Sequence, residues 1–126
     1  MAPPTPLHHL ALRTRDVARL AAFYRDVLGL PERARNLADG GALRSVWLDA
    51  GGVVVMIELA APGEPAPPAG SLDLVAFAMS AGEREAFRAR FAAAGAAVEA
   101  ETAHTLYVRD PDGRRVGVSS YAFGAP

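Results

Sequence analysis

The chain has 126 residues, with 13 basic and 14 acidic side chains, a net charge of −1 and no cysteine. A chain of this length folds as one compact domain, which we assign to residues 1–126. The interspersed charges exclude a basic face for nucleic acid or anionic lipid, and the lack of cysteine excludes disulfides and thiolate chemistry. No secretory signal and no membrane-spanning stretch is predicted, so we expect a cytoplasmic protein without nucleic-acid or membrane partners.

Residues 7–60 are predicted to form a βαβββ module. In the opening strand, residues 7–14, apolar residues alternate with a second set that includes His9 and Arg13. Asp16 is a suitable helix N-cap, and apolar residues at helical spacing continue to Leu28. Three further strands are expected at residues 32–36, 42–49 and 53–59, separated by glycine pairs.

Residues 71–121 are predicted to repeat this order after a proline-rich linker at residues 61–70. A strand is expected at 72–79, followed by a helix that opens with a capping box between Ser80 and Glu83. The remaining strands are expected at residues 97–101, 105–109 and 114–121, the last two joined by a turn in RDPDGRR.

The two halves match each other along the chain. Aligning their opening strands sets His9 against Leu74, and the helix residues Phe23 and Phe87 align with a similar offset. Duplication of one module is the simplest explanation. The first module therefore carries an imidazole where the second carries an apolar side chain.

The stretches HHLALRTRDVARLAAFYRDVLGL and YVRDPDGRRVGV resemble the vicinal oxygen chelate superfamily, which includes glyoxalase I, extradiol dioxygenases, fosfomycin-resistance enzymes and bleomycin-binding proteins. The resemblance extends from Leu7 to about Tyr121. It implies an α+β fold in which two βαβββ modules form a glyoxalase-like half-barrel with ligands in its concave face. It also implies pairing into a homodimer.

The same resemblance implies four metal-ligand positions, on the first and last strands of each module. They correspond here to His9, Glu58, Leu74 and Gly117. Leucine and glycine cannot hold a metal, and catalytic sites normally keep three protein ligands. The metal set, His9 and Glu58, is therefore incomplete, and we expect no cofactor. Three alternatives remain for this pair: an ion pair across the sheet, a divalent-metal site completed by a substitute ligand, or a general base without metal.

We expect an apolar face with a few polar anchors in place of the metal, roomier where Glu has become Gly. Seven residues are candidates for ligand binding: Arg13, Trp47, Met56, Leu74, His104, Gly117 and Tyr121. An arginine equivalent to Arg13 contacts glutathione in glyoxalase I, but a salt bridge to Glu58 or Asp49 is an alternative. Trp47 either stacks on a planar ligand or packs in the core or a dimer seam.

These features favour a protein that binds an apolar or aromatic small molecule in an inter-module cleft without turnover. The alternative is an enzyme, a metal-assisted lyase, isomerase or dioxygenase using His9 and Glu58 with a substitute ligand. A third reading is a structural or regulatory dimer whose cavity its own side chains fill. The sequence leaves open whether the protein is an enzyme.

Overall fold

The computed structural model describes residues 6–65 and 71–124, and the chain divides into two compact units, Met1–Glu64 and Pro65–Pro126. The division falls in the proline-rich stretch expected to be a linker, of which residues 66–70 lie outside the described part. Within the described ranges, no helix has the length and apolar character needed to cross a membrane.

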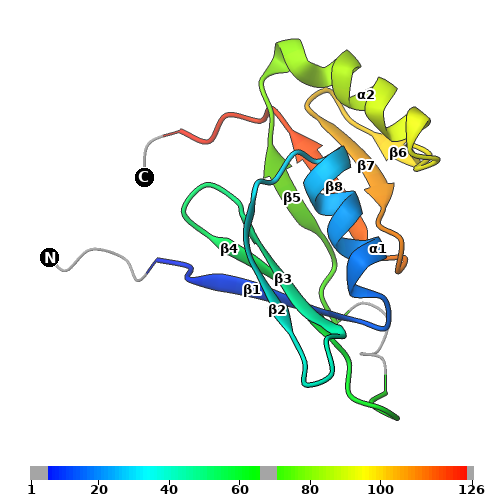
Figure 1. The fold of residues 1–126 in the computed structure, drawn as a ribbon. Coiled ribbons are helices and arrows are strands. Elements are labelled where there is room, and N and C mark those ends of the chain that lie inside the picture. The colour runs from blue at the N-terminus through cyan, green and yellow to red at the C-terminus, as the bar shows by residue number, and fades with distance from the viewer. Residues whose placement is uncertain (1–5, 66–70, 125–126) are drawn as a thin grey trace, which may run out of the picture. The chain divides into compact units, whose positions relative to one another are not determined.

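The first unit holds a four-stranded mixed sheet with the order β1-β4-β3-β2 (Figure 1). Its strands are β1 (His9–Thr14), β2 (Glu32–Leu37), β3 (Leu43–Asp49) and β4 (Val54–Leu59). Strands β1 and β4 run parallel, and the other pairs are antiparallel. Gly40 and Gly41 both have positive φ in the tight connection between β2 and β3, a conformation that favours glycine. The predicted βαβββ order of this half is confirmed.

The helical segment of the first unit begins as predicted but does not stay regular. Asp16 caps α1 (Val17–Ala22), its carboxylate accepting a hydrogen bond from the Arg19 backbone N–H at 3.1 Å. The next five residues form the π-helical turn η1 (Phe23–Val27), where the sequence pattern predicts continued α-helix. The wider turn accompanies two adjacent buried aromatic rings, Phe23 and Tyr24, which pack edge to face. A regular helix would separate two such neighbours by about 100° around its axis.

The second unit repeats the topology with shorter strands, in the order β5-β8-β7-β6. Its elements are β5 (Val75–Ala78), η2 (Ala81–Glu83), α2 (Arg84–Ala93), β6 (Ala100–Glu101), β7 (Thr105–Arg109) and β8 (Arg115–Ser119). Both halves of the predicted capping box are present between Ser80 and Glu83, although the first turn is a 3₁₀ helix. In the turn before β8, buried Asp110 accepts hydrogen bonds from the backbone N–H groups of Asp112 and Arg114.

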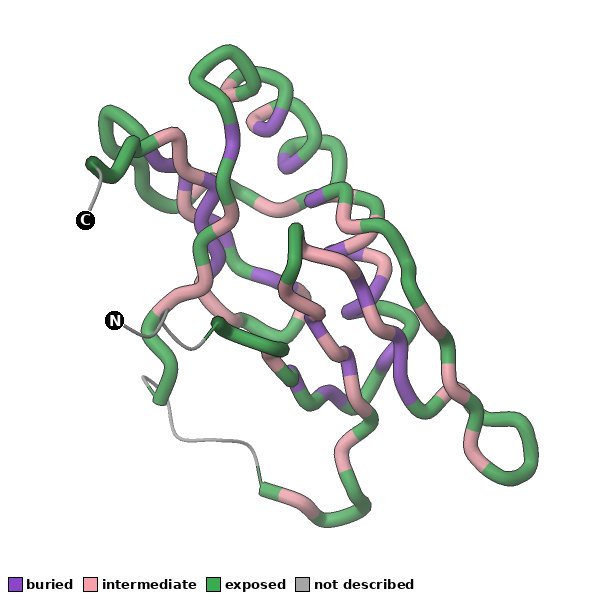
Figure 2. The backbone as a smooth tube through the Cα atoms, turned by 90° about the vertical axis from the view of Figure 1, so that its left-hand side faces the viewer, coloured by how far each residue is buried: buried purple, intermediate pink, exposed green. Residues whose placement is uncertain are grey.

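Each sheet has one buried face and one face that is more open. Helix α1 packs against β3 and β4, and α2 packs against β7. The buried face of the first sheet carries Leu12, Val46, Leu48, Val55 and Ile57, and that of the second carries Leu106, Val108, Val116 and Val118. Figure 2 shows buried residues recurring along the strands and helices while the loops are exposed. Alternation along the strands places the candidate residues of β1, β3, β4 and β8 on the opposite, open faces.

Candidate functional site

The open face of the first sheet consists of three rows of residues that face one another across the strands. The rows are His9–Val54–Asp49, Ala11–Met56–Trp47–Ala34 and Arg13–Glu58–Ser45–Asn36. His9 and Glu58 thus share a face, as expected, but belong to different rows. Four residues of strand separate those rows, or about 13 Å at the usual rise per residue. The register does not bring the two predicted metal ligands together.

Glu58 lies among partners other than His9. Its carboxylate accepts a hydrogen bond from the indole Nε1 of Trp47 at 3.2 Å, and its register partner on β1 is Arg13. Arg13 also forms an ion pair with Glu64, with its Nε 3.6 Å from Oε1, in the segment after β4. Trp47 therefore uses its single polar atom to orient Glu58, and the ring remains only partly buried.

His9 lies at the exposed start of β1. Its Nδ1 is 2.9 Å from Nδ1 of His8, which allows one shared hydrogen bond. His9 and Glu58 form no ion pair within the described residues, so that alternative is not realised. No group of three His, Cys, Asp or Glu side chains converges anywhere in residues 6–65 and 71–124. The described residues of one chain thus do not by themselves supply the three protein ligands that catalytic metal sites normally have.

The register of the second sheet shows which residue of the first unit corresponds to Gly117. Across the second sheet, one row is Ala76–Gly117–Tyr107–Ala100. Its counterpart in the first sheet is Ala11–Met56–Trp47–Ala34, because Ala11 aligns with Ala76. Met56, not Glu58, therefore occupies the position equivalent to Gly117. The counterpart of Glu58 is Ser119, one row further along.

The surroundings of Gly117 correct one expectation. A Cβ atom added at Gly117 would lie 3.3 Å from Thr105 Cγ2, 3.4 Å from Leu74 Cδ1 and 3.5 Å from Ala76 Cβ. Leu74 and Gly117 are thus brought together as predicted, but the neighbours occupy the space that a side chain would take. The expectation that glycine makes this part of the face roomier is wrong, because Leu74 and Thr105 close over it.

Sequence reasoning did not single out Arg115 and Tyr107, which lie beside Gly117 on the same face. The Arg115 guanidinium carbon lies 4.4 Å from the centre of the Tyr107 ring. Arg115 and its strand partner Arg109 both contact Glu99, at 3.4 and 3.0 Å. The Arg115 Nε is buried and makes no hydrogen bond, since its approach to Glu99 is an ion pair without hydrogen-bond geometry. The signal was available: Arg115 precedes Gly117 by two residues and must share its face.

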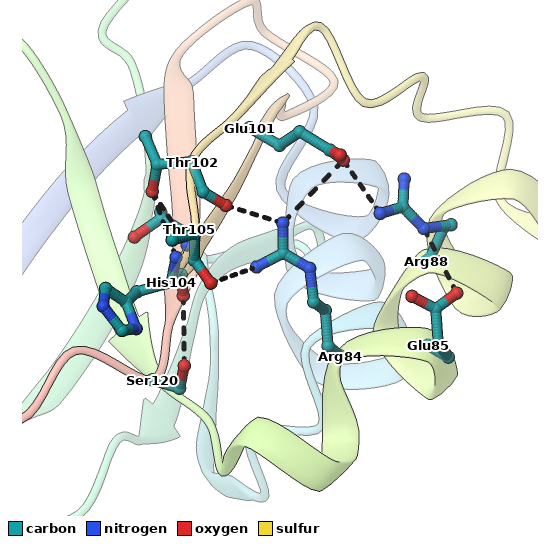
Figure 3. Close-up of polar contacts among 9 residues, drawn as sticks. Arg84, Glu85, Arg88, Glu101, Thr102, His104, Thr105 and Ser120 are labelled. Carbon is teal, nitrogen blue, oxygen red and sulfur yellow. Dashed lines mark hydrogen bonds and ion pairs between the residues drawn. The ribbon is translucent and has the colours of Figure 1, made fainter.

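His104 lies in a short loop before β7 that Arg84 holds in place (Figure 3). The Arg84 guanidinium donates to the carbonyls of Thr102 at 2.7 Å and Ala103 at 3.3 Å. The Glu101 carboxylate accepts a hydrogen bond from the Arg88 guanidinium at 2.8 Å, and this hydrogen bond holds the pKa of the Glu101 carboxyl below its ordinary value. The loop is therefore fixed by side-chain contacts from α2.

The His104 ring begins a series of three rings joined by two edge-to-face contacts. It meets Tyr121 edge to face at 5.5 Å, and Tyr121 meets Phe123 at 5.0 Å. Tyr121 is 56% exposed and Phe123 is 88% exposed. Two of the predicted ligand-binding residues are thus in contact, His104 from the loop before β7 and Tyr121 from the segment that follows β8.

Comparison with known proteins agrees with this architecture. Residues 6–118 match the model of the Glyoxalase/Bleomycin resistance protein/Dioxygenase superfamily. A search of curated protein sequences finds no match.

Several solved structures share the fold. A fosfomycin resistance protein, FosX, from Listeria monocytogenes, in a complex with Mn(II) and a dihydroxypropylphosphonic acid, is 16% identical, with a TM-score of 0.79 and 96% of each chain covered. A lactoylglutathione lyase from Agrobacterium tumefaciens is 26% identical, with a TM-score of 0.63 and coverage of 94% of this chain and 95% of that one. TioX from Micromonospora sp. ML1 is 23% identical, with a TM-score of 0.70 and coverage of 94% and 100%.

Both the paired βαβββ modules and the match over residues 6–118 lead to the same assignment. The chain belongs to the glyoxalase/bleomycin resistance/dioxygenase superfamily, the vicinal oxygen chelate proteins.

Proposed function

We propose that this protein binds an apolar or aromatic small molecule on the open faces of its sheets and does not convert it. The observation that carries the proposal is the register of the two sheets. The positions equivalent to one another on the first and last strands hold His9, Met56, Leu74 and Gly117. Only the first of these offers an imidazole or carboxylate, so the set is poorer in ligands than the sequence alone implies.

The side chains that replace the ligands suit binding. Met56 and Leu74 add apolar surface, and Trp47 and Tyr107 lie at equivalent places in the two sheets. The indole N–H of Trp47 is fixed by Glu58, and aromatic rings of this kind are typical of surfaces that hold planar ligands. Homodimer formation, expected from the family, is part of the same proposal.

Elemental analysis tests the proposal most directly. The protein is incubated with Ni, Co, Mn, Fe and Zn ions, desalted, and compared with Glu58→Ala. We expect metal well below one ion per chain in both proteins. Asp39→Ala, which removes an exposed carboxylate from a turn of the same unit, is the matched control. Near-stoichiometric metal that disappears only in Glu58→Ala would contradict the proposal and favour a metalloenzyme.

A screen of planar aromatic compounds supplies the positive side of the test. Trp47 is the single tryptophan, so its emission reports on the open face of the first unit. Saturable quenching without chemical change of the compound is expected for a binder. Consumption of the compound would show turnover and overturn the non-catalytic part of the proposal.

A further inference from the structure

The open face of the second sheet carries a cation in an unusual setting. Arg115 lies on β8 with its guanidinium over the Tyr107 ring and its Nε buried without a hydrogen bond. That Nε lies 3.4 Å from Glu99 Oε1 without hydrogen-bond geometry, so only an electrostatic attraction compensates for the water that it has lost. The Arg115 side chain as a whole is 31% exposed, which leaves the guanidinium accessible to an acceptor supplied by a ligand.

Charge on this face is also unbalanced. Arg109 and Arg115 are partners across β7 and β8, and both contact the single carboxylate of Glu99. Arg109 makes the better contact, donating from Nε at 3.0 Å, and it has a second acceptor in the carbonyl of Gly113. Among the described residues, Arg115 has only the ion pair at 3.4 Å and the ring of Tyr107. A second anion beside Arg115 would therefore be attracted rather than repelled.

The groups next to Arg115 are apolar. Gly117 follows two residues later on the same face, with Leu74 and Ala76 packed against it. Tyr107 is the strand partner of Gly117, and its ring packs against the Arg115 guanidinium. A molecule whose anionic group met Arg115 would thus have its body on the side chains of Leu74 and Ala76, which cover Gly117. The combination matches an acid with an apolar body.

We propose that Arg115, held over Tyr107, is the anchor for an anionic group, so that the ligand of this protein is an aromatic or apolar acid. The inference rests on the proposed binding function and adds the chemical class of the ligand. Arg115 is the binding residue, and Tyr107 positions it. Glu99 competes with the ligand for Arg115 and can remain paired with Arg109 when the ligand binds.

Calorimetric titration with two matched probes tests the anchor. The first probe is 2-naphthoate, which is anionic at neutral pH, and the second is 2-naphthalenemethanol, which has the same ring system without charge. The wild-type protein is expected to bind 2-naphthoate about tenfold more tightly, in line with one charge-assisted hydrogen bond. Arg115→Gln should remove that preference and leave the affinity for the alcohol unchanged.

Two further variants separate an anchor from a merely structural residue. Glu99→Gln removes the competing carboxylate and should raise the affinity for 2-naphthoate alone. Arg90→Gln makes the same charge change on α2, where the guanidinium lies over the Phe87 ring, and should alter neither affinity. If the role of Arg115 were structural, Arg115→Gln would instead lower the affinity for both probes.

The outcomes distinguish the two proposals. Equal binding of both probes by the wild-type protein, unaffected by Arg115→Gln, would overturn the anchor and leave the binding function standing. Failure of the wild-type protein to bind either probe would contradict the binding function and the anchor together. Circular dichroism of each variant shows whether the fold is retained. If Arg115→Gln is not folded, Arg115→Lys, which keeps the charge but not the planar group, replaces it.

Discussion

At the scale of single residues, Gly117 shows how closely the second sheet is packed on its open face. An alanine there would bring its Cβ to 3.3 Å from Thr105 and 3.4 Å from Leu74. Overpacking of this kind costs about 1–3 kcal/mol, and the gain from replacing a strand glycine offsets part of it. We expect Gly117→Ala to lower the free energy of unfolding by about 1 kcal/mol, measured by urea denaturation.

The double variant Gly117→Ala, Leu74→Ala provides the control. Shortening Leu74 removes one of the three contacts and leaves that of Thr105 at 3.3 Å, so the alanine at position 117 should cost less relative to Leu74→Ala alone than it costs in the wild-type protein. Additive effects of the two substitutions would mean that Leu74 does not confine position 117.

The candidate site was predictable in its faces but not in its register. Alternation along a strand is a local property, so the sequence sufficed to place His9, Arg13 and Glu58 on one side of the first sheet. Which residue lies opposite which depends on how two strands slide past each other. That shift separated His9 from Glu58 and placed Met56 opposite Ala11. The sequence motif around Glu58 suggested an equivalence that differs from the structural one by two residues.

At the scale of the elements, the capping box of the second helix has a measurable pH dependence. The Glu83 carboxylate accepts a hydrogen bond from the Ser80 backbone N–H at 2.8 Å, which lowers the pKa of Glu83 below its ordinary value of 4.5. A carboxyl with a lowered folded-state pKa stabilises the protein above its unfolded-state pKa. That contribution is lost as the pH falls through the folded-state value. Arg90 adds a smaller attraction in the same direction.

We therefore expect Glu83→Gln to reduce the loss of stability between pH 7 and pH 3, because glutamine does not titrate. Urea denaturation followed by circular dichroism at both pH values gives the comparison. Glu85→Gln is the matched control, since Glu85 lies outside the capping box and pairs with Arg88 at 3.3 Å. An unchanged acid response in Glu83→Gln would show that the cap does not contribute to the pH dependence.

The elements themselves were largely predictable from the sequence. Caps and turns depend on the residues next to them in the sequence, so Asp16, Ser80 and the RDPDG turn were placed correctly. The π-helical turn at Phe23–Val27 was not, because apolar residues at helical spacing do not distinguish a π turn from a regular α-helix.

At the scale of the whole molecule, the duplication makes each unit a control for the other. In the second unit, Leu74 Cδ1 lies 3.4 Å from the place where a Cβ at Gly117 would be, although the two residues are one row apart. The same relation in the first unit joins His9 and Met56. If the two units are equivalent, a carboxylate at position 56 would reach His9, whereas Glu58 does not.

The last prediction follows from that equivalence. Met56→Glu should create a histidine–carboxylate pair and give weak binding of Ni²⁺, measured by equilibrium dialysis as metal retained in excess over the wild-type protein. Adding His9→Ala should abolish the gain, and Met56→Gln, which has a similar shape without the charge, should show none. A gain that survived loss of His9 would mean that the ion is held elsewhere. Equal Ni²⁺ retention by the wild-type protein would mean that Glu58 and His9 already approach each other, contrary to the register of β1 and β4. Either result would mean that the pairing of the first and last strands differs between the two units.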